Sequence, residues 1–123
     1  MQPRTVGQTP AYSEEEAEQV FQFPELKIDP IRREVVIRDE VCELRPKEFD
    51  LLYHFAKYPG KIFTREQLLE QVWGYDFMGD MRTVDVHVKK LRSKLKHLKH
   101  TYIHTVWGVG YKFEVVLDAD SQN

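Results

Sequence analysis

One segment, residues 80–99, constrains the fold more than any other part of the chain. At the roughly 100° per residue of an α-helix, its apolar residues share one narrow side. These residues are Val84, Val88, Leu91, Leu95 and Leu98. Between residues 82 and 99 there are also seven Lys or Arg residues and one acid, Asp85. The pattern predicts a helix from Asp80 to Lys99 with one face for a core and one for a polyanion, because phosphate attraction dominates nucleic-acid affinity.

Charge is distributed unevenly along the chain, although its overall balance predicts no partner. The net charge of the 123 residues is −2, yet residues 13–18 carry four acids and no base, while residues 89–99 carry six bases and no acid. Such asymmetry points to a polyanion partner for the basic segment. Cys42 is the only cysteine, which excludes an intramolecular disulfide and any zinc site with two thiolate ligands.

Composition along the chain predicts one domain with two tails. Residues 1–20 are polar and read as a flexible linker or tail, residues 21–117 as the domain, and residues 118–123 as a C-terminal tail. No apolar run reaches the length of a membrane span, and the N-terminus has no apolar signal segment. We therefore expect a cytoplasmic protein that does not contact membranes, and we expect no cofactor.

The first half of the predicted domain combines short strands with one helix. Residues 21–44 contain short alternating apolar runs with a turn at Asp29-Pro30, which predicts three or four antiparallel strands. Pro46 occupies the favoured first position of a helix, and Tyr58-Pro59-Gly60 ends it. Residues 61–63 then form a short extended connector.

The second half predicts two helices and a hairpin. Thr64 and Gln67 form a capping box for a second helix of about residues 65–72, and Asp80 or Thr83 can cap the third. Two glycines within residues 107–110 lie between alternating runs, which is typical of a β-hairpin. The order of strands, three helices and hairpin predicts an α+β fold: a winged helix-turn-helix with an N-terminal antiparallel β-sheet, three helices and a C-terminal β-hairpin wing.

Three stretches resemble the effector domain of OmpR/PhoB-type bacterial response regulators. They are LRPKEFDLLYHFAKYPGKIFTREQLLEQVWG, DMRTVDVHVKKLRSKL and HTVWGVGYKFEV. The resemblance implies sequence-specific binding of double-stranded DNA by a two-component regulator of transcription, with the third helix in the major groove and the wing near the minor groove. It also implies a phosphorylatable receiver domain, which is missing from this chain. The last stretch is similar to regulators of respiration (ResD-like).

The resemblance implies that the third helix reads bases. Lys89 and Lys90 lie on its polar face, and Lys90 matches a base-contacting position that is often arginine. Val86 lies among the cations, where its methyl groups can contact a thymine methyl. His87 lies at the edge of the apolar stripe, where packing and DNA contact are equal alternatives. Asp85 precedes Lys89 by one turn, and we expect these two to form a weak pair.

Phosphate contacts are expected from several elements. The matching family positions are Arg65, Trp73, Arg82 and Arg92. Trp73 can donate its indole N–H or can belong to the core. We expect the more distal lysines of the helix to add only long-range attraction, and these are Lys94, Lys96 and Lys99.

The predicted wing departs from the family pattern. In many relatives a basic residue that reaches the minor groove stands where this chain has Trp107. Tryptophan cannot neutralise a phosphate, so it either packs against sugar edges, inserts apolar surface or stays on the protein. Thr105 remains a candidate for a backbone or base contact. With Trp107 on the wing, the helix is expected to carry more of the sequence reading.

The resemblance also implies partners beyond DNA. The loop between the last two helices is expected to contact RNA polymerase, and Tyr75, Phe77 and Met78 suit an interface, although packing within the domain is an equal alternative. Relatives bind direct-repeat half-sites as tandem homodimers. Half-sites about one helical turn apart, roughly 10–11 bp, follow from that geometry.

Two other classes of function compete with DNA binding. An enzyme is disfavoured, because the chain has no glycine-rich phosphate loop and no HExxH motif. His97, His100 and His104 are spaced for a metal, but neighbouring lysines oppose a cation there, so no metal site is expected. The main alternative is a winged-helix protein-interaction module without specific DNA binding, which would show no salt-dependent retention on heparin or random DNA.

Overall fold

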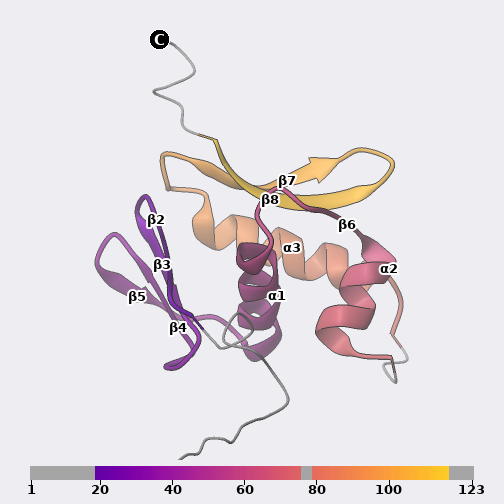
Figure 1. Ribbon diagram of the computed structural model, residues 1–123, viewed down its shortest axis with the longest axis horizontal. Coiled ribbons are helices and arrows are strands. Elements are labelled where there is room, and N and C mark those ends of the chain that lie inside the picture. Colours follow the sequence, from indigo (N-terminus) through magenta and orange to yellow (C-terminus); the bar gives the residue numbers. More distant parts are fainter. Residues whose placement is uncertain (1–18, 76–78, 117–123) are drawn as a thin grey trace, which may run out of the picture.

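Figure 1 shows a four-stranded sheet at one end of the molecule, three helical segments beside it, and a hairpin above the helices. This is a computed structural model, and the structure describes residues 19–75 and 79–116. The predicted C-terminal tail and most of the predicted N-terminal tail lie outside the described residues. The predicted architecture, a winged helix-turn-helix behind an antiparallel sheet, is confirmed.

The N-terminal sheet consists of four short antiparallel strands that are neighbours in chain order. They are β2 (Phe21–Phe23), β3 (Leu26–Asp29), β4 (Glu34–Ile37) and β5 (Glu40–Cys42). Asp29 makes the predicted turn, because its Oδ1 accepts the backbone N–H groups of Ile31 at 3.0 Å and Arg32 at 3.2 Å. An aspartate that bonds its own chain in this way favours a turn over a longer strand.

The first helix, α1 (Pro46–Lys57), begins at the predicted Pro46 and ends just before the predicted stop at Tyr58-Pro59-Gly60. Glu48 reaches back to accept the backbone N–H of Arg45 at 2.9 Å, which satisfies an amide at the start of the helix. At the other end Gly60 has φ +84°, a conformation that glycine adopts without strain.

The second helix begins at the predicted capping box. Thr64 Oγ1 accepts the Gln67 N–H at 3.0 Å, and the Gln67 side chain accepts the Thr64 N–H at 2.9 Å. The helix has two parts, α2 (Arg65–Leu68) and a π-helical turn, η2 (Leu69–Trp73). The wider turn ends where the Gly74 N–H donates to the Leu69 carbonyl at 3.0 Å.

The third helix, α3 (Arg82–Leu95), is shorter than predicted at both ends. Beyond Leu95 the chain is held by hydrogen bonds to turn residues of the N-terminal sheet. The Lys99 N–H donates to the Glu25 carboxylate at 2.9 Å, and the Arg38 guanidinium donates to the His97 carbonyl. These tertiary bonds replace the helical ones, so the apolar period continues to Leu98 after the helix itself has ended.

The hairpin belongs to a three-stranded antiparallel sheet in the order β6-β8-β7. The strands are β6 (Ile62–Thr64), β7 (Thr101–Val106) and β8 (Gly110–Val116). The predicted extended connector is therefore an edge strand, β6, and the sequence did not reveal it because the strand is only three residues long. Gly110 is required at the crossing, because a Cβ there would lie 2.0 Å from the Phe63 carbonyl oxygen.

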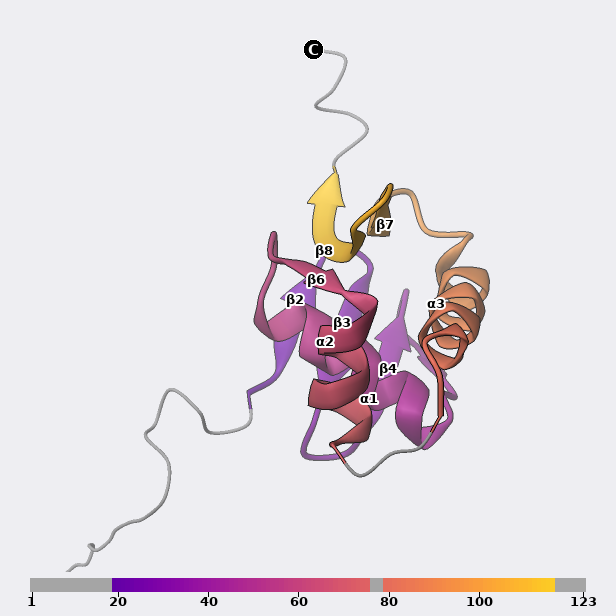
Figure 2. The same cartoon turned by 90° about the vertical axis from the view of Figure 1, so that its right-hand side faces the viewer.

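One core joins both sheets and the helices. It includes Leu26 from the first sheet, Phe55 from α1 and Phe113 from β8, each at most 1% exposed. The predicted apolar stripe is confirmed as buried, and its members are Val84, Val88, Leu91, Leu95 and Leu98. α3 packs against α1 and β7 and lies along one side of the molecule in Figure 2. Its polar side therefore faces away from the core.

Candidate nucleic-acid interface

The exposed side of α3 carries a stripe that we call the outer stripe, formed by Arg82, Val86, Lys89 and Lys90. The spacing of four, three and one residues keeps all of them on neighbouring turns of one face. Val86 is 47% exposed, and both lysines are exposed. Neither lysine forms an ion pair with another residue in the described parts of the chain. The outer stripe thus presents unpaired ammonium groups around an apolar patch.

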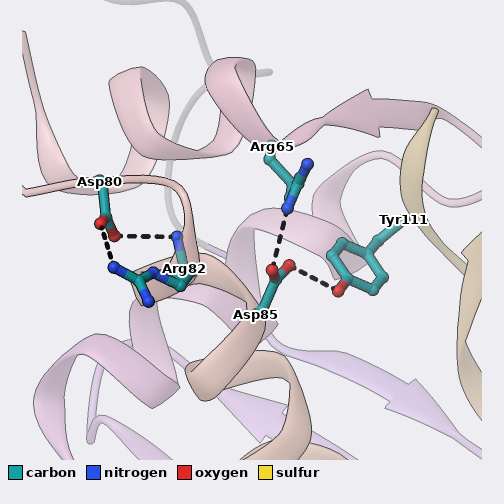
Figure 3. Close-up of polar contacts among 5 residues, drawn as sticks. All are labelled: Arg65, Asp80, Arg82, Asp85 and Tyr111. Carbon is teal, nitrogen blue, oxygen red and sulfur yellow. Dashed lines mark hydrogen bonds and ion pairs between the residues drawn. The ribbon is translucent and has the colours of Figure 1, made fainter. Parts of the chain in front are cut away.

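Asp80 closes the N-terminal end of the outer stripe (Figure 3). Its carboxylate accepts the backbone N–H of Arg82 at 3.0 Å and pairs with the Arg82 guanidinium at 3.3 Å. The N-cap residue of α3 is Met81, which forms no side-chain cap bond, so the prediction of Asp80 or Thr83 as the cap is wrong. Asp80 lies one residue earlier and accepts the first helical amide, that of Arg82. The ion pair is exposed, with side-chain exposures of 85% and 63%, and such pairs contribute little stability. Arg82 can therefore exchange its carboxylate partner for a phosphate at low cost.

Three side chains from three elements meet beside the outer stripe, and we call them the clasp: Arg65, Asp85 and Tyr111. Asp85 Oδ2 accepts from the Arg65 guanidinium at 3.0 Å, and its Oδ1 accepts from the Tyr111 hydroxyl at 2.7 Å. Figure 3 shows the carboxylate of α3 lying between the other two. Burial, followed by the hydrogen bond to Asp85, raises the pKa of Tyr111. The phenol therefore stays protonated and remains a donor at neutral pH.

The clasp corrects the pairing expected from helical spacing. Asp85 pairs with Arg65, twenty residues away, rather than with Lys89 one turn along. A guanidinium from the adjacent element and a fixed phenol occupy both carboxylate oxygens. Lys89 is consequently left exposed and without an ion pair among the described residues.

Arg92 lies at the boundary between α3 and the wing. Its Nε donates to the Ile103 carbonyl at 3.2 Å, and another guanidinium nitrogen donates to Thr105 Oγ1 at 2.6 Å. The guanidinium carbon also lies 5.5 Å from the centre of the Tyr111 ring. A guanidinium has five N–H donors, so Arg92 fixes the wing strand and retains donors for another acceptor.

Trp73 and His87 pack against each other. Their rings meet edge to face with centroids 5.0 Å apart, and His87 Nδ1 lies 2.8 Å from the Thr83 carbonyl oxygen. Trp73 is half-buried against the core. For His87 the structure favours the packing role of the two alternatives, because its ring is engaged on both sides.

The wing ends in exposed apolar side chains. The Val109 N–H donates to the Val106 carbonyl at 2.9 Å across a turn in which Gly108 has φ +80°. Trp107 is 88% exposed and Val109 is 49% exposed. The turn therefore directs the Trp107 indole away from the protein. A hollow lies between this turn and the clasp, and its lining includes Arg65, Thr105 and Tyr111.

The loop before α3 is described only in part. Tyr75 is 85% exposed, whereas Phe77 and Met78 lie outside the described residues. No group of three side chains suited to hold a metal occurs in the described ranges. The same ranges contain no helix long and apolar enough to cross a membrane.

The partners of Lys94 were also missed from the sequence. Lys94, expected to act only at long range, donates to the buried Glu48 at 2.8 Å and to the Glu43 carbonyl at 3.0 Å. Burial by itself would raise the pKa of Glu48, but the bonds from Lys94 and the Arg45 amide hold it below its usual value. The position of Glu48 three residues after Arg45 is a signal for its bond to the Arg45 amide, but it does not reveal Lys94 as a partner.

Residues 39–113 match the family described as "Transcriptional regulatory protein, C terminal". The chain belongs to this family. The matched region runs from the turn before β5 to the last core residue of β8, so it includes the outer stripe, the clasp and the wing. The assignment as an OmpR/PhoB-type effector domain is confirmed.

Relatives of this effector domain agree with that assignment. The chain is 50% identical over 115 residues to the transcriptional regulatory protein SrrA of Staphylococcus aureus, covering 91% of this chain and 48% of SrrA. It therefore spans about half the length of the curated relatives that it matches.

Two solved structures share the fold. The RstA DNA-binding domain of Klebsiella pneumoniae, solved in complex with the RstA box, is 35% identical with a TM-score of 0.69, over 78% of this chain and 97% of that one. DrrB, an OmpR/PhoB homolog from Thermotoga maritima, is 36% identical with a TM-score of 0.71, over 77% of this chain and 44% of that one.

Proposed function

We propose that this effector domain binds double-stranded DNA in a sequence-specific manner and thereby regulates transcription within a two-component response regulator. The observation that carries the proposal is the outer stripe: a helix anchored by buried side chains, with unpaired lysines on the side away from the core. A major groove admits one such helix. The likeness to RstA, which was solved with bound DNA, supports the same use of this surface.

Base reading is assigned to the middle of the outer stripe. Lys89 and Lys90 can donate to the acceptors of guanine, and the exposed Val86 can contact a thymine methyl. Lysine lacks the rigid fork of arginine, so each lysine contributes less discrimination than an arginine would. The apolar contact of Val86 consequently matters for A·T preference.

Phosphate contacts are assigned to groups around the outer stripe. Arg82 holds an exposed partner that a phosphate can replace, and Arg92 retains free donors. Arg65 reaches the same side from α2, and Trp73 lies at the end of the adjacent turn. Such contacts position the protein on the duplex and carry no sequence information.

The wing is assigned an apolar role at the edge of the minor groove. Trp107 is exposed at the turn and Thr105 is tied to Arg92 behind it, so the indole is the group that meets sugar edges. Trp107 fluorescence in a Trp73→Phe background tests this assignment. We expect a change on addition of specific duplex, and an unchanged spectrum at saturating DNA would place Trp107 outside the interface.

Two further partners are assigned from the resemblance to the family. The exposed Tyr75, with Phe77 and Met78, is assigned to a contact with RNA polymerase, and a tandem homodimer is assigned to direct-repeat half-sites. In the full regulator, a Tyr75→Ala/Phe77→Ala variant should bind DNA normally and activate or repress transcription poorly. Normal DNA binding together with normal transcription would remove the polymerase contact.

Selection of bound duplexes from a random pool tests the proposed function itself. The chain should enrich a short motif, and paired copies should recur as direct repeats roughly 10–11 bp apart. Retention on random DNA should fall steeply with salt. No enrichment together with salt-independent retention would favour the protein-interaction module instead.

A further inference from the structure

We propose that Asp85 is a positioning residue for DNA binding, which acts by holding Arg65 in place against the recognition helix. The inference rests on the proposed function and assigns a role to an acid on a surface that faces a polyanion. It concerns the clasp, where one carboxylate of α3 joins a side chain from α2 to a side chain from β8.

The geometry separates this role from base reading. Both oxygens of Asp85 are engaged, Oδ2 by Arg65 at 3.0 Å and Oδ1 by Tyr111 at 2.7 Å. An aspartate that reads cytosine must offer an oxygen to the exocyclic amine. For that, Asp85 would have to share an oxygen that already accepts from one of two strong donors.

The clasp also fixes elements that are remote in sequence. Arg65 lies 20 residues before Asp85 and Tyr111 lies 26 residues after it, so other segments of the chain separate their elements from α3. A flexible arginine that must order on binding loses side-chain entropy, and a partner that holds it beforehand removes part of this loss. Asp85 thus prepares Arg65 for a phosphate and fixes the base of the wing through Tyr111.

Electrostatics alone predicts the opposite sign. A carboxylate beside phosphates repels them, so removal of its charge should strengthen DNA binding. If Asp85 acts through Arg65, removal of the charge should weaken binding instead. The direction of the change therefore distinguishes positioning from simple repulsion.

A matched pair of variants measures that direction. Asp85→Asn keeps the size of the side chain and removes its charge, and Glu66→Gln makes the same change in charge at an exposed residue next to Arg65. The salt slope, defined as the change in the logarithm of the association constant with the logarithm of salt concentration, is measured on one random duplex. We expect Asp85→Asn to lose about one unit of slope, which at 0.1 M salt is about eightfold in affinity. Glu66→Gln should bind as tightly as the wild type or slightly tighter.

An Arg65→Gln background shows whether Asp85 acts through Arg65. Arg65→Gln alone should lose about the same unit of salt slope. Asp85→Asn added to Arg65→Gln should then cause no further loss, because the guanidinium that the carboxylate holds is already absent and the Asn oxygen can still accept from the Tyr111 hydroxyl. A merely structural role for Asp85 would weaken binding equally in both backgrounds.

Several results would overturn the proposal. They are tighter binding by Asp85→Asn, an equal loss in the Arg65→Gln background, or a selection profile altered at a single base pair. Circular dichroism at the assay temperature checks that each variant is folded. If Asp85→Asn is unfolded, Asp85→Glu replaces it. The longer acid displaces the guanidinium and should lower affinity about twofold to threefold, in line with the small energies of exposed pairs. Wild-type affinity would overturn the proposal. Failure of the wild type to bind any duplex would instead refute the proposed function.

Discussion

Residues 82–90 and 91–99, which we call the first and second halves of the basic segment, carry three and four Lys or Arg residues and use them differently. In the first half Lys89 and Lys90 are exposed and unpaired among the described residues, and Arg82 has only an exposed partner. In the second half Arg92 is bonded to β7, and Lys94 is bonded to Glu48 and to the Glu43 carbonyl. The difference shows that a run of cations in a sequence is not a uniform surface. What each cation does depends on which element faces it.

The largest effect should come from breaking the pair in the second half. Glu48 is 1% exposed, and Glu48→Gln removes a charge-assisted bond while leaving Lys94 beside a neutral amide. We expect a loss of about 2 kcal/mol in the free energy of unfolding, measured by urea denaturation. Glu43→Gln, which removes a charge from an exposed neighbour, should change stability little. A Glu48→Gln protein as stable as the wild type would mean that the Lys94–Glu48 pair does not stabilise the fold.

The same pair should make stability depend on pH at the acid end. The pKa of Glu48 is lowered from 4.5 in the folded state. A lowered carboxyl pKa contributes stability that is fully present above the unfolded value and is lost as pH falls through the folded value. We therefore expect wild-type stability to decline below about pH 4.5 more steeply than that of Glu48→Gln. Parallel declines in thermal scans would contradict the assignment.

In the first half of the basic segment, Lys90→Ala should affect binding and leave folding intact. We expect a loss of about 1–2 kcal/mol for the selected site and a relaxed preference at one position. The matched control is Lys96→Ala, which removes an exposed charge just beyond the helix. It should weaken binding less and should leave the preference unchanged. Equal effects of the two variants would erase the distinction between the halves.

Arg92, near the start of the second half, is bonded to the wing and retains free donors, so it should show both behaviours. Arg92→Ala should lower the affinity for every duplex by about 1 kcal/mol, flatten the salt slope by about one unit, and lower the melting temperature because the bonds to Ile103 and Thr105 are lost. Arg92→Lys separates the effects, since it keeps the charge and loses the fork. A loss of affinity confined to one base position would contradict the phosphate role.

The smallest effect is expected at Val86. Val86→Ser should reduce the preference for A·T at one or two positions by less than about 1 kcal/mol, because about one methyl contact is lost. Affinity for random duplex should remain nearly unchanged. A selection profile identical to that of the wild type would exclude Val86 from base reading.

Local chemistry made most of the fold predictable. Pro46, the Thr64–Gln67 capping box and the Asp29 turn mark boundaries through bonds within a few residues, and all three are confirmed. The apolar stripe of α3 followed from helical period alone. The three-residue strand β6 was missed because its partner β8 lies about fifty residues away and a run so short has no period of its own.

Long-range polar contacts in the site were not predictable in the same way. Asp85 has a lysine one turn away, so helical spacing favoured the wrong partner over Arg65. The hairpin contained one usable signal, since its register places Thr105 opposite Tyr111. Both side chains bond to α3, Thr105 through Arg92 and Tyr111 through Asp85. The domain boundaries, the ResD-like subfamily and the individual DNA contacts stay predictions.

Two salt slopes on one duplex test the central claim, that the exposed lysines in the first half of the basic segment face DNA and those in the second half do not. Lys89→Gln/Lys90→Gln is compared with Lys96→Gln/Lys99→Gln, since each removes two exposed charges. We predict that the first pair lowers the salt slope by about 1.8 units and the second by less than about 0.5. Equal decreases, or a larger decrease for the second pair, would contradict the account.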